Sequence, residues 1–145
     1  MDSETLIAYI DGSYSNQLKV YSFGAVILTP DGGIIEQNGS NNHEDALENW
    51  NVAGELLGAM YVTRWAVNNN YKKIIIRHDY EGIAKWFTRE WKAKSFSARE
   101  YRVYMDKMSN CIEIAFEKVA AHSGDKYNDI ADNLAKQAIA SYSLT

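Results

Sequence analysis

Two carboxylates in this sequence each end a short segment with the pattern of a buried β-strand. Asp11 follows the apolar run 6–10, and Asp79 ends the segment 72–79, whose centre is apolar. A carboxylate in that position is unfavourable unless a partner neutralises its charge. If the two strands are parallel neighbours, both side chains emerge at one edge of the sheet, where open α/β sheets bind ligands. We therefore predict a divalent metal as their shared partner.

Two further acids, Glu55 and Asp132, each lie near the start of an expected helix and have apolar neighbours in the sequence. Four carboxylates that converge repel one another unless cations lie among them. Hard oxygen ligands suit Mg²⁺ or Mn²⁺, and two such ions about 3.5–4 Å apart can clamp a scissile phosphate. Each acid also has a plainer interpretation: Asp11 as a turn former, Asp79 as a helix cap, and the other two as ordinary helix-start acids.

The elements that must position these acids follow from hydrophobic periodicity and turn residues. We expect strands over 5–11, 20–29, 34–39, 72–79 and 112–119, and helices over 51–69, 80–88, 97–110 and 128–141. Short connections make the first three strands antiparallel, and a strand after a long helix is most simply parallel to an earlier one. The predicted class is α/β, with the order β-β-β-α-β-α-α-β-α and helices packed on a mixed five-stranded sheet.

Several local features refine this prediction. We expect Asn51 and Ser97 to cap their helices, and residues 40–50 to form a loop. Gly54 and Gly58 lie one turn apart inside a helix, where glycine is unfavourable, so something must approach that face closely. A neighbouring strand is favoured over a ligand backbone as the approaching group.

The charge of the chain is unevenly distributed. The net charge is −4, yet residues 64–107 hold 11 of the 15 Lys and Arg against 5 acids, a balance of +6. A basic region of this kind can steer an anionic ligand such as nucleic acid, or can simply be a set of solvated helix faces. Cys111 has no partner for an internal disulfide, which fits a reducing compartment. We expect its side chain to be buried within the protein. We expect one domain over 1–145, a cytoplasmic location and no membrane association.

The motifs taken together resemble type 1 ribonuclease H over nearly the whole chain. They are Asp11-Gly12-Ser13 after a strand, Glu55 in the first long helix, Asp79 ending the next strand, His122-x-Gly124, and Asn128-x-x-Ala131-Asp132-x-Leu134-Ala135. The segments 78–83 and 121–128 are most similar to the bacterial branch often joined to a viroplasmin-like hybrid-binding module. We expect no such module within these 145 residues.

The resemblance implies a ribonuclease H-like fold and an endonuclease that cuts the RNA strand of RNA–DNA hybrids with two Mg²⁺ ions, with Mn²⁺ as a substitute. Asp11 would bridge both ions, Asp132 would serve the ion that activates water, and Glu55 and Asp79 the ion on the leaving-group side. His122 would assist proton transfer or product departure. Candidate substrate contacts are Asn51, Gly12, Ser13, Gly54 and Asn128.

The chain also departs from the family pattern. His78 and Tyr80 flank Asp79, where many members have serine or threonine, and alternation along a strand predicts that His78 points away from Asp79. The basic handle of some members is shortened to residues 86–94, in which Trp91, Lys92 and Lys94 could grip the DNA strand while Trp86 joins the core. We expect weak, salt-sensitive binding of the hybrid.

Three functions stay open at this point. The leading one is a monomeric hybrid-cutting nuclease without an organic cofactor. The first alternative is a catalytically silent hybrid-binding module of the same fold, which the four acids argue against. The second is a DNA-processing nuclease of the same superfold, such as a resolvase or transposase core, which the 128–135 motif disfavours. Fold alone cannot separate them, because function resides in the site.

Overall fold

The computed structural model describes residues 3–44, 50–120 and 125–143. Its elements are, in order, β1 (Thr5–Ser15), β2 (Val20–Leu28), β3 (Ile34–Asn41), α1 (Trp50–Asn68), β4 (Lys73–His78), α2 (Gly82–Thr88), α3 (Phe96–Met108), β5 (Glu113–Lys118) and α4 (Lys126–Ser143). This is the predicted order of strands and helices. No helix in these described ranges is long and apolar enough to cross a membrane.

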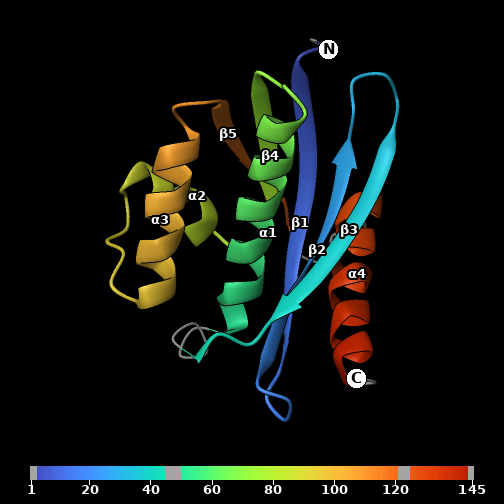
Figure 1. The fold of residues 1–145 in the computed structure, drawn as a ribbon, viewed down its shortest axis with the longest axis vertical. Helices are drawn as coiled ribbons and strands as arrows, with labels where there is room; N and C mark the ends of the chain where they lie inside the picture. The colour runs from blue at the N-terminus through green and yellow to red at the C-terminus, as the bar shows by residue number, and fades with distance from the viewer. Residues whose placement is uncertain (1–2, 45–49, 121–124, 144–145) are drawn as a thin grey trace.

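The five strands form one mixed sheet in the order β3-β2-β1-β4-β5. The pairs β1–β2 and β2–β3 are antiparallel, whereas β4 is parallel to both β1 and β5. Figure 1 shows α1, α2 and α3 on one side of the sheet and α4 on the other. The predicted α/β class and mixed sheet are confirmed.

Alternation along β1 divides its side chains between two hydrophobic cores. Leu6 and Ile10 face the larger core under α1, α2 and α3, whereas Ile7 and Tyr9 pack in a smaller core that α4 covers. In β4, the buried residues alternate in the same way. Trp86 is 8% exposed and belongs to the larger core, as predicted.

Strand β1 is longer than predicted, and this changes the interpretation of its acid. The parallel pairing with β4 ends at Tyr9, opposite Arg77, but the antiparallel pairing with β2 continues to Ser15. The prediction that the strand ends at Asp11 is therefore wrong, and so is the plainer interpretation of Asp11 as a turn former. Asp11 instead lies just past the end of the parallel pair, where β4 no longer flanks β1.

Both predicted caps are also wrong. Helix α3 is capped by Ser95, whose side-chain oxygen accepts a hydrogen bond from the Ala98 backbone N–H, so Ser97 lies inside the helix. Helix α1 begins at Trp50, which places Asn51 inside it. Serine is a good cap at either of two nearby positions, and the sequence does not tell them apart.

Other segments differ from their predictions by a few residues. Strand β3 runs to Asn41, two residues into the expected loop, because its pairing with β2 continues to Tyr21. The rest of that loop includes residues 45–49, which lie outside the described residues. Cys111 is exposed rather than buried, since it lies in the turn after α3, where its backbone N–H donates to the Met108 carbonyl.

The glycines of α1 allow the helix to lie directly on the sheet. A Cβ at Gly54 would stand 2.0 Å from the Ser22 carbonyl oxygen, and a Cβ at Gly12 would stand 2.6 Å from the backbone nitrogen of Glu55. A Cβ at Gly58 would meet side-chain atoms rather than backbone, with the Phe23 Cβ at 3.1 Å and the Ile10 Cβ at 3.5 Å. The favoured prediction, that a neighbouring strand approaches this helix face, is confirmed.

This contact predicts a contrast between two substitutions in one helix. Gly54→Ala should lower the free energy of unfolding by at least about 2 kcal/mol, because the new methyl group meets backbone atoms that cannot move aside. Gly58→Ala should change it by less than about 1 kcal/mol, because the gain in helix propensity offsets a mild contact. Urea unfolding of the two variants measures the difference. Equal losses would contradict the proposed close approach at Gly54.

Candidate metal and catalytic site

Three of the four predicted acids come together at the end of the parallel strands. Asp11, Glu55 and Asp79 each offer a carboxylate oxygen, and these oxygens lie within 4.8 Å of one another. They come from β1, from α1 and from the residue after β4. Asp11 is 8% exposed and Glu55 is 4% exposed, so the group is largely shielded from water. Asp79 does not cap α2, whose N-cap position is Glu81.

Asp11 interacts with each of the other three acids. By alternation with Ile7 and Tyr9 it points to the α4 side of the sheet, and its Oδ1 accepts a hydrogen bond from the Gly12 backbone N–H at 2.9 Å. The pKa of Asp11 is raised from its ordinary value of 3.8 to about 7. Burial is the largest cause, and the negative charges of Asp79 and Asp132 also contribute to this rise. An acid with such a pKa takes up a proton or a cation readily.

Glu55 reaches the group from the other face of the sheet, on the buried side of α1. Its Oε2 accepts a hydrogen bond from the Tyr80 backbone N–H at 3.1 Å, which ties α1 to the segment that carries Asp79. Burial raises the pKa of Glu55 well above its ordinary value, with further contributions from a hydrogen bond to Asp79 and from its charge.

Asp132 joins the group through Asp11. The hydrogen bond and the charge of Asp132 both act on the Asp11 carboxyl, so α4 brings the fourth acid to the same place. Its Oδ2 also lies 2.9 Å from the Lys136 ammonium, one helical turn later. The sequence reasoning missed Lys136, although the i,i+4 spacing of an acid and a lysine on one helix is a signal that could have found it.

The structure places the remaining predicted site residues in several different environments. His122 lies outside the described residues, as does the side chain of Asn51. Asn128 is 3% exposed, and its side-chain oxygen has no hydrogen-bond partner among the described residues. Ser13 lies in β1 opposite Ser22. The substrate contacts expected of these residues, and of Gly12 and Gly54, stay predictions.

His78 has a structural role, as its strand position predicts. It is 1% exposed and lies beside Phe116, and its Nδ1 lies 2.8 Å from the Tyr80 carbonyl oxygen. Burial lowers its pKa, which favours the neutral ring. His78 thus supports the backbone at Tyr80, whose N–H contacts Glu55.

The shortened handle forms an open hollow of about 510 Å³ beside α2. Its walls are Trp86, Glu90, Trp91, Lys92, Lys94 and Ser95. Trp91 packs its ring against Tyr80 and Trp86, and the Lys85 ammonium lies 5.4 Å from the centre of the Trp91 ring. The three predicted DNA-gripping residues are therefore neighbours around one basic and aromatic hollow.

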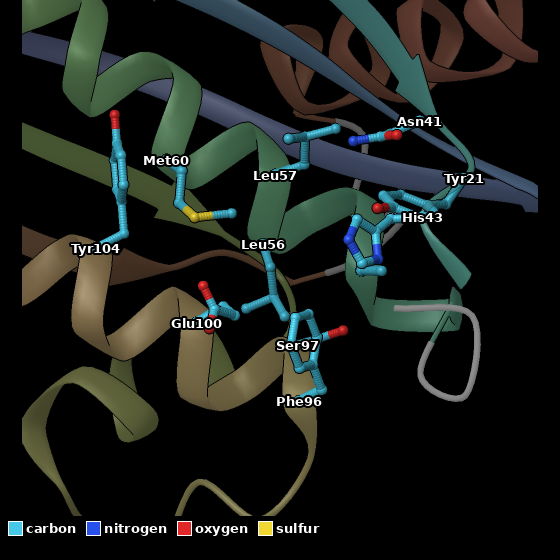
Figure 2. Close-up of a pocket in the computed structure, with 11 residues that line it drawn as sticks. Tyr21, Asn41, His43, Leu56, Leu57, Met60, Phe96, Ser97, Glu100 and Tyr104 are labelled. Carbon is cyan, nitrogen blue, oxygen red and sulfur yellow. The ribbon is translucent and has the colours of Figure 1, made fainter. Parts of the chain in front are cut away.

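A second cavity, of about 250 Å³, lies between α1 and α3 and is lined by Glu100 but by none of the four acids of the candidate site. Figure 2 shows its apolar floor of Leu56, Leu57 and Met60, with Phe96 and Tyr104 contributed by α3. Its shape and lining do not coincide with the carboxylate group. We therefore assign the chemistry to the acids rather than to this cavity.

The residues at the acidic site fit a divalent cation. All the donors are carboxylate oxygens, the type of ligand that Mg²⁺ and Mn²⁺ prefer. Asp11 and Glu55 are buried, and repulsion between neighbouring acids contributes to the raised pKa of both. A cation among them would remove that repulsion, whereas an ordinary structural role would not explain why these acids meet.

Comparisons with known proteins agree with this geometry. The RNase H family model matches residues 3–140. A ribonuclease H of Wolbachia pipientis wMel is 30% identical, over 96% of this chain and 98% of that protein. RNase H1 from the halophilic archaeon Halobacterium salinarum NRC-1 shares the fold, with a TM-score of 0.78, 21% identity and coverage of 94% of this chain and 98% of that one. LC11-RNase H1 in complex with an RNA/DNA hybrid has a TM-score of 0.65 at 13% identity, over 92% of this chain and 99% of that one.

The raised pKa of Asp11 predicts how the stability of the metal-free protein depends on pH. Between the ordinary value of 3.8 and about 7, folded Asp11 keeps a proton that the unfolded chain releases, so the free energy of unfolding falls as the pH rises. In EDTA, Asp11→Asn should therefore be more stable than the wild type at pH 8, by on the order of 2–4 kcal/mol, with little difference near pH 4.

Urea unfolding across this pH range measures the effect. Glu36→Gln, which removes an exposed carboxylate from β3, is the matched control and should follow the wild type at every pH. A constant difference between Asp11→Asn and the wild type from pH 4 to pH 8 would contradict the raised pKa.

Proposed function

Because the chain belongs to the RNase H family, we propose that it is an endonuclease that hydrolyses the RNA strand of RNA–DNA hybrids. The observation that supports this most is the meeting of Asp11, Glu55 and Asp79, with Asp132 against Asp11. The same arrangement argues against a silent binding module, because such a module would bury these charges without chemical need.

Each acid has a proposed place in the reaction. Asp11 interacts with each of the other three acids and would contact both metal ions, with Asp132 on the side of the attacking water and Glu55 and Asp79 on the side of the leaving oxygen. Two bound Mg²⁺ ions, or Mn²⁺ in their place, would supply activation of water and stabilisation of the leaving oxygen. The products would carry 5′-phosphate and 3′-hydroxyl ends.

The protein itself contributes orientation. The Gly12 N–H fixes one oxygen of Asp11, and the Tyr80 N–H fixes one oxygen of Glu55. Backbone donors move little, so both carboxylates are held in place before any substrate arrives. We assign His122 to proton transfer or product departure, on the basis of its place in the family motif.

We propose that the hybrid lies across the acids with its DNA strand in the hollow formed by Trp91, Lys92 and Lys94. An aromatic ring can stack on a base, and two ammonium groups can pair with backbone phosphates. The RNA strand would be identified by its 2′-hydroxyls in the shallow minor groove. Asn51, Gly12, Ser13, Gly54 and Asn128 remain the proposed contacts near the cut.

The test is a cleavage assay with three labelled substrates: an RNA–DNA hybrid, duplex RNA and duplex DNA. We expect cleavage of the RNA strand of the hybrid alone, with Mg²⁺ or Mn²⁺ and not with EDTA. Asp132→Asn should reduce the rate of hybrid cleavage at least about 100-fold, because it removes one of the carboxylates proposed to hold the metal ions that stabilise charge developing at the reacting phosphate. The variant should still fold, as judged by circular dichroism.

Asp129→Asn is the control, because it removes an exposed carboxylate from the first turn of the same helix. It should cut the hybrid at close to the wild-type rate. Cleavage of duplex DNA would favour a DNA-processing nuclease, and hybrid binding without any cleavage would favour the silent module. Near-normal turnover by Asp132→Asn would remove Asp132 from the proposed site.

A further inference from the structure

Lys136 lies on α4 one turn after Asp132, and its side chain points back to the acids. Its ammonium nitrogen is 2.9 Å from Asp132 Oδ2, and the negative charge of Asp11 also acts on it. The Lys136 side chain is 63% exposed, whereas that of Asp132 is 21% exposed. The lysine therefore reaches from the solvent to the rim of the carboxylate group.

The value of this ion pair does not lie in helix stability. Exposed i,i+4 pairs stabilise a helix only slightly, because water screens them and two side chains must be ordered. Asp132 differs from an ordinary helix acid in facing Asp11, behind which lie Glu55 and Asp79. A positive charge at this position offsets part of the repulsion within the whole group.

We propose that Lys136 is an internal counter-ion of the carboxylate group, which holds Asp132 in the metal-free protein and competes with the divalent cation for it. This inference rests on the proposed function, because it requires that Asp132 bind a metal ion. Binding of that ion weakens the ion pair between Lys136 and Asp132, and the exposed Lys136 side chain can then move into the solvent. The consequence is a metal site of reduced affinity, from which the ion departs more easily.

Titration calorimetry of MnCl₂ and MgCl₂ into the metal-free protein, without nucleic acid and at low salt, tests the proposal. Lys136→Met should bind Mn²⁺ about threefold to tenfold more tightly than the wild type, because a unit positive charge near a dication has been removed. The difference should shrink in high salt. Lys136→Arg keeps the charge and should stay within about twofold of the wild type.

Lys107→Met is the matched control for net charge. Lys107 is exposed in the last turn of α3, next to the segment that leads into the amino end of β5, whereas the acids lie at the carboxyl end of the parallel strands. It should bind Mn²⁺ like the wild type. In EDTA, Lys136→Met should also melt at a lower temperature than Lys107→Met, because the acids then repel one another without compensation.

The outcomes separate this inference from the proposed function. Equal or weaker Mn²⁺ binding by Lys136→Met, with normal binding by the wild type, would overturn the counter-ion role and leave the nuclease proposal intact. Tighter binding by Lys136→Met and Lys107→Met alike would also overturn it, because the effect would then come from net charge. A wild type that binds neither ion at millimolar concentration would overturn both.

Discussion

Helix α1 can deliver Glu55 to the sheet only because no side chain separates its first turns from β1 and β2. Gly54 lies against the Ser22 carbonyl, and Gly12 leaves room for the backbone of Glu55 itself. The two glycines belong to different elements, yet both clear space at one crossing. Without this close approach the carboxylate of Glu55 would lie farther from Asp11 and Asp79, and the three carboxylates would not come together.

This crossing creates an electrostatic problem that the rest of the site must solve. Asp11 and Glu55 are nearly shielded from water, and each is close to another acid. A proton, the ammonium of Lys136 or a divalent cation can each relieve the repulsion, and each leaves the acids in a different state. The backbone donors at Gly12 and Tyr80 hold the carboxylates in place throughout. The same burial that makes the metal-free protein less stable at neutral pH favours binding of a cation.

Most of the fold could be predicted from local sequence patterns. The errors lie where contacts with segments distant in the sequence set the structure. Apolar runs and helical periodicity are properties of single segments, so each helix and strand of the described residues has a predicted counterpart. Strand β1 continues past Asp11 because β2 continues beside it, which is a long-range pairing without a local signal. For the same reason the sequence gives no sign that Gly12 leaves room for the backbone of α1. The acids themselves were predicted because they end apolar strands or start apolar helices and together match the family motifs, and Lys136 was missed because lysines at i+4 are common on helices.

Anomalous X-ray scattering from a crystal of the wild-type protein soaked in Mn²⁺ is the most direct measurement of whether these carboxylates form a metal site. We expect a strong anomalous peak among the side chains of Asp11, Glu55 and Asp79, within bonding distance of at least one oxygen of each. The peak should be lost from crystals of Asp11→Asn soaked in the same way. The absence of a peak among these acids at saturating Mn²⁺, whether or not one is found elsewhere in the molecule, would show that they do not form a metal site.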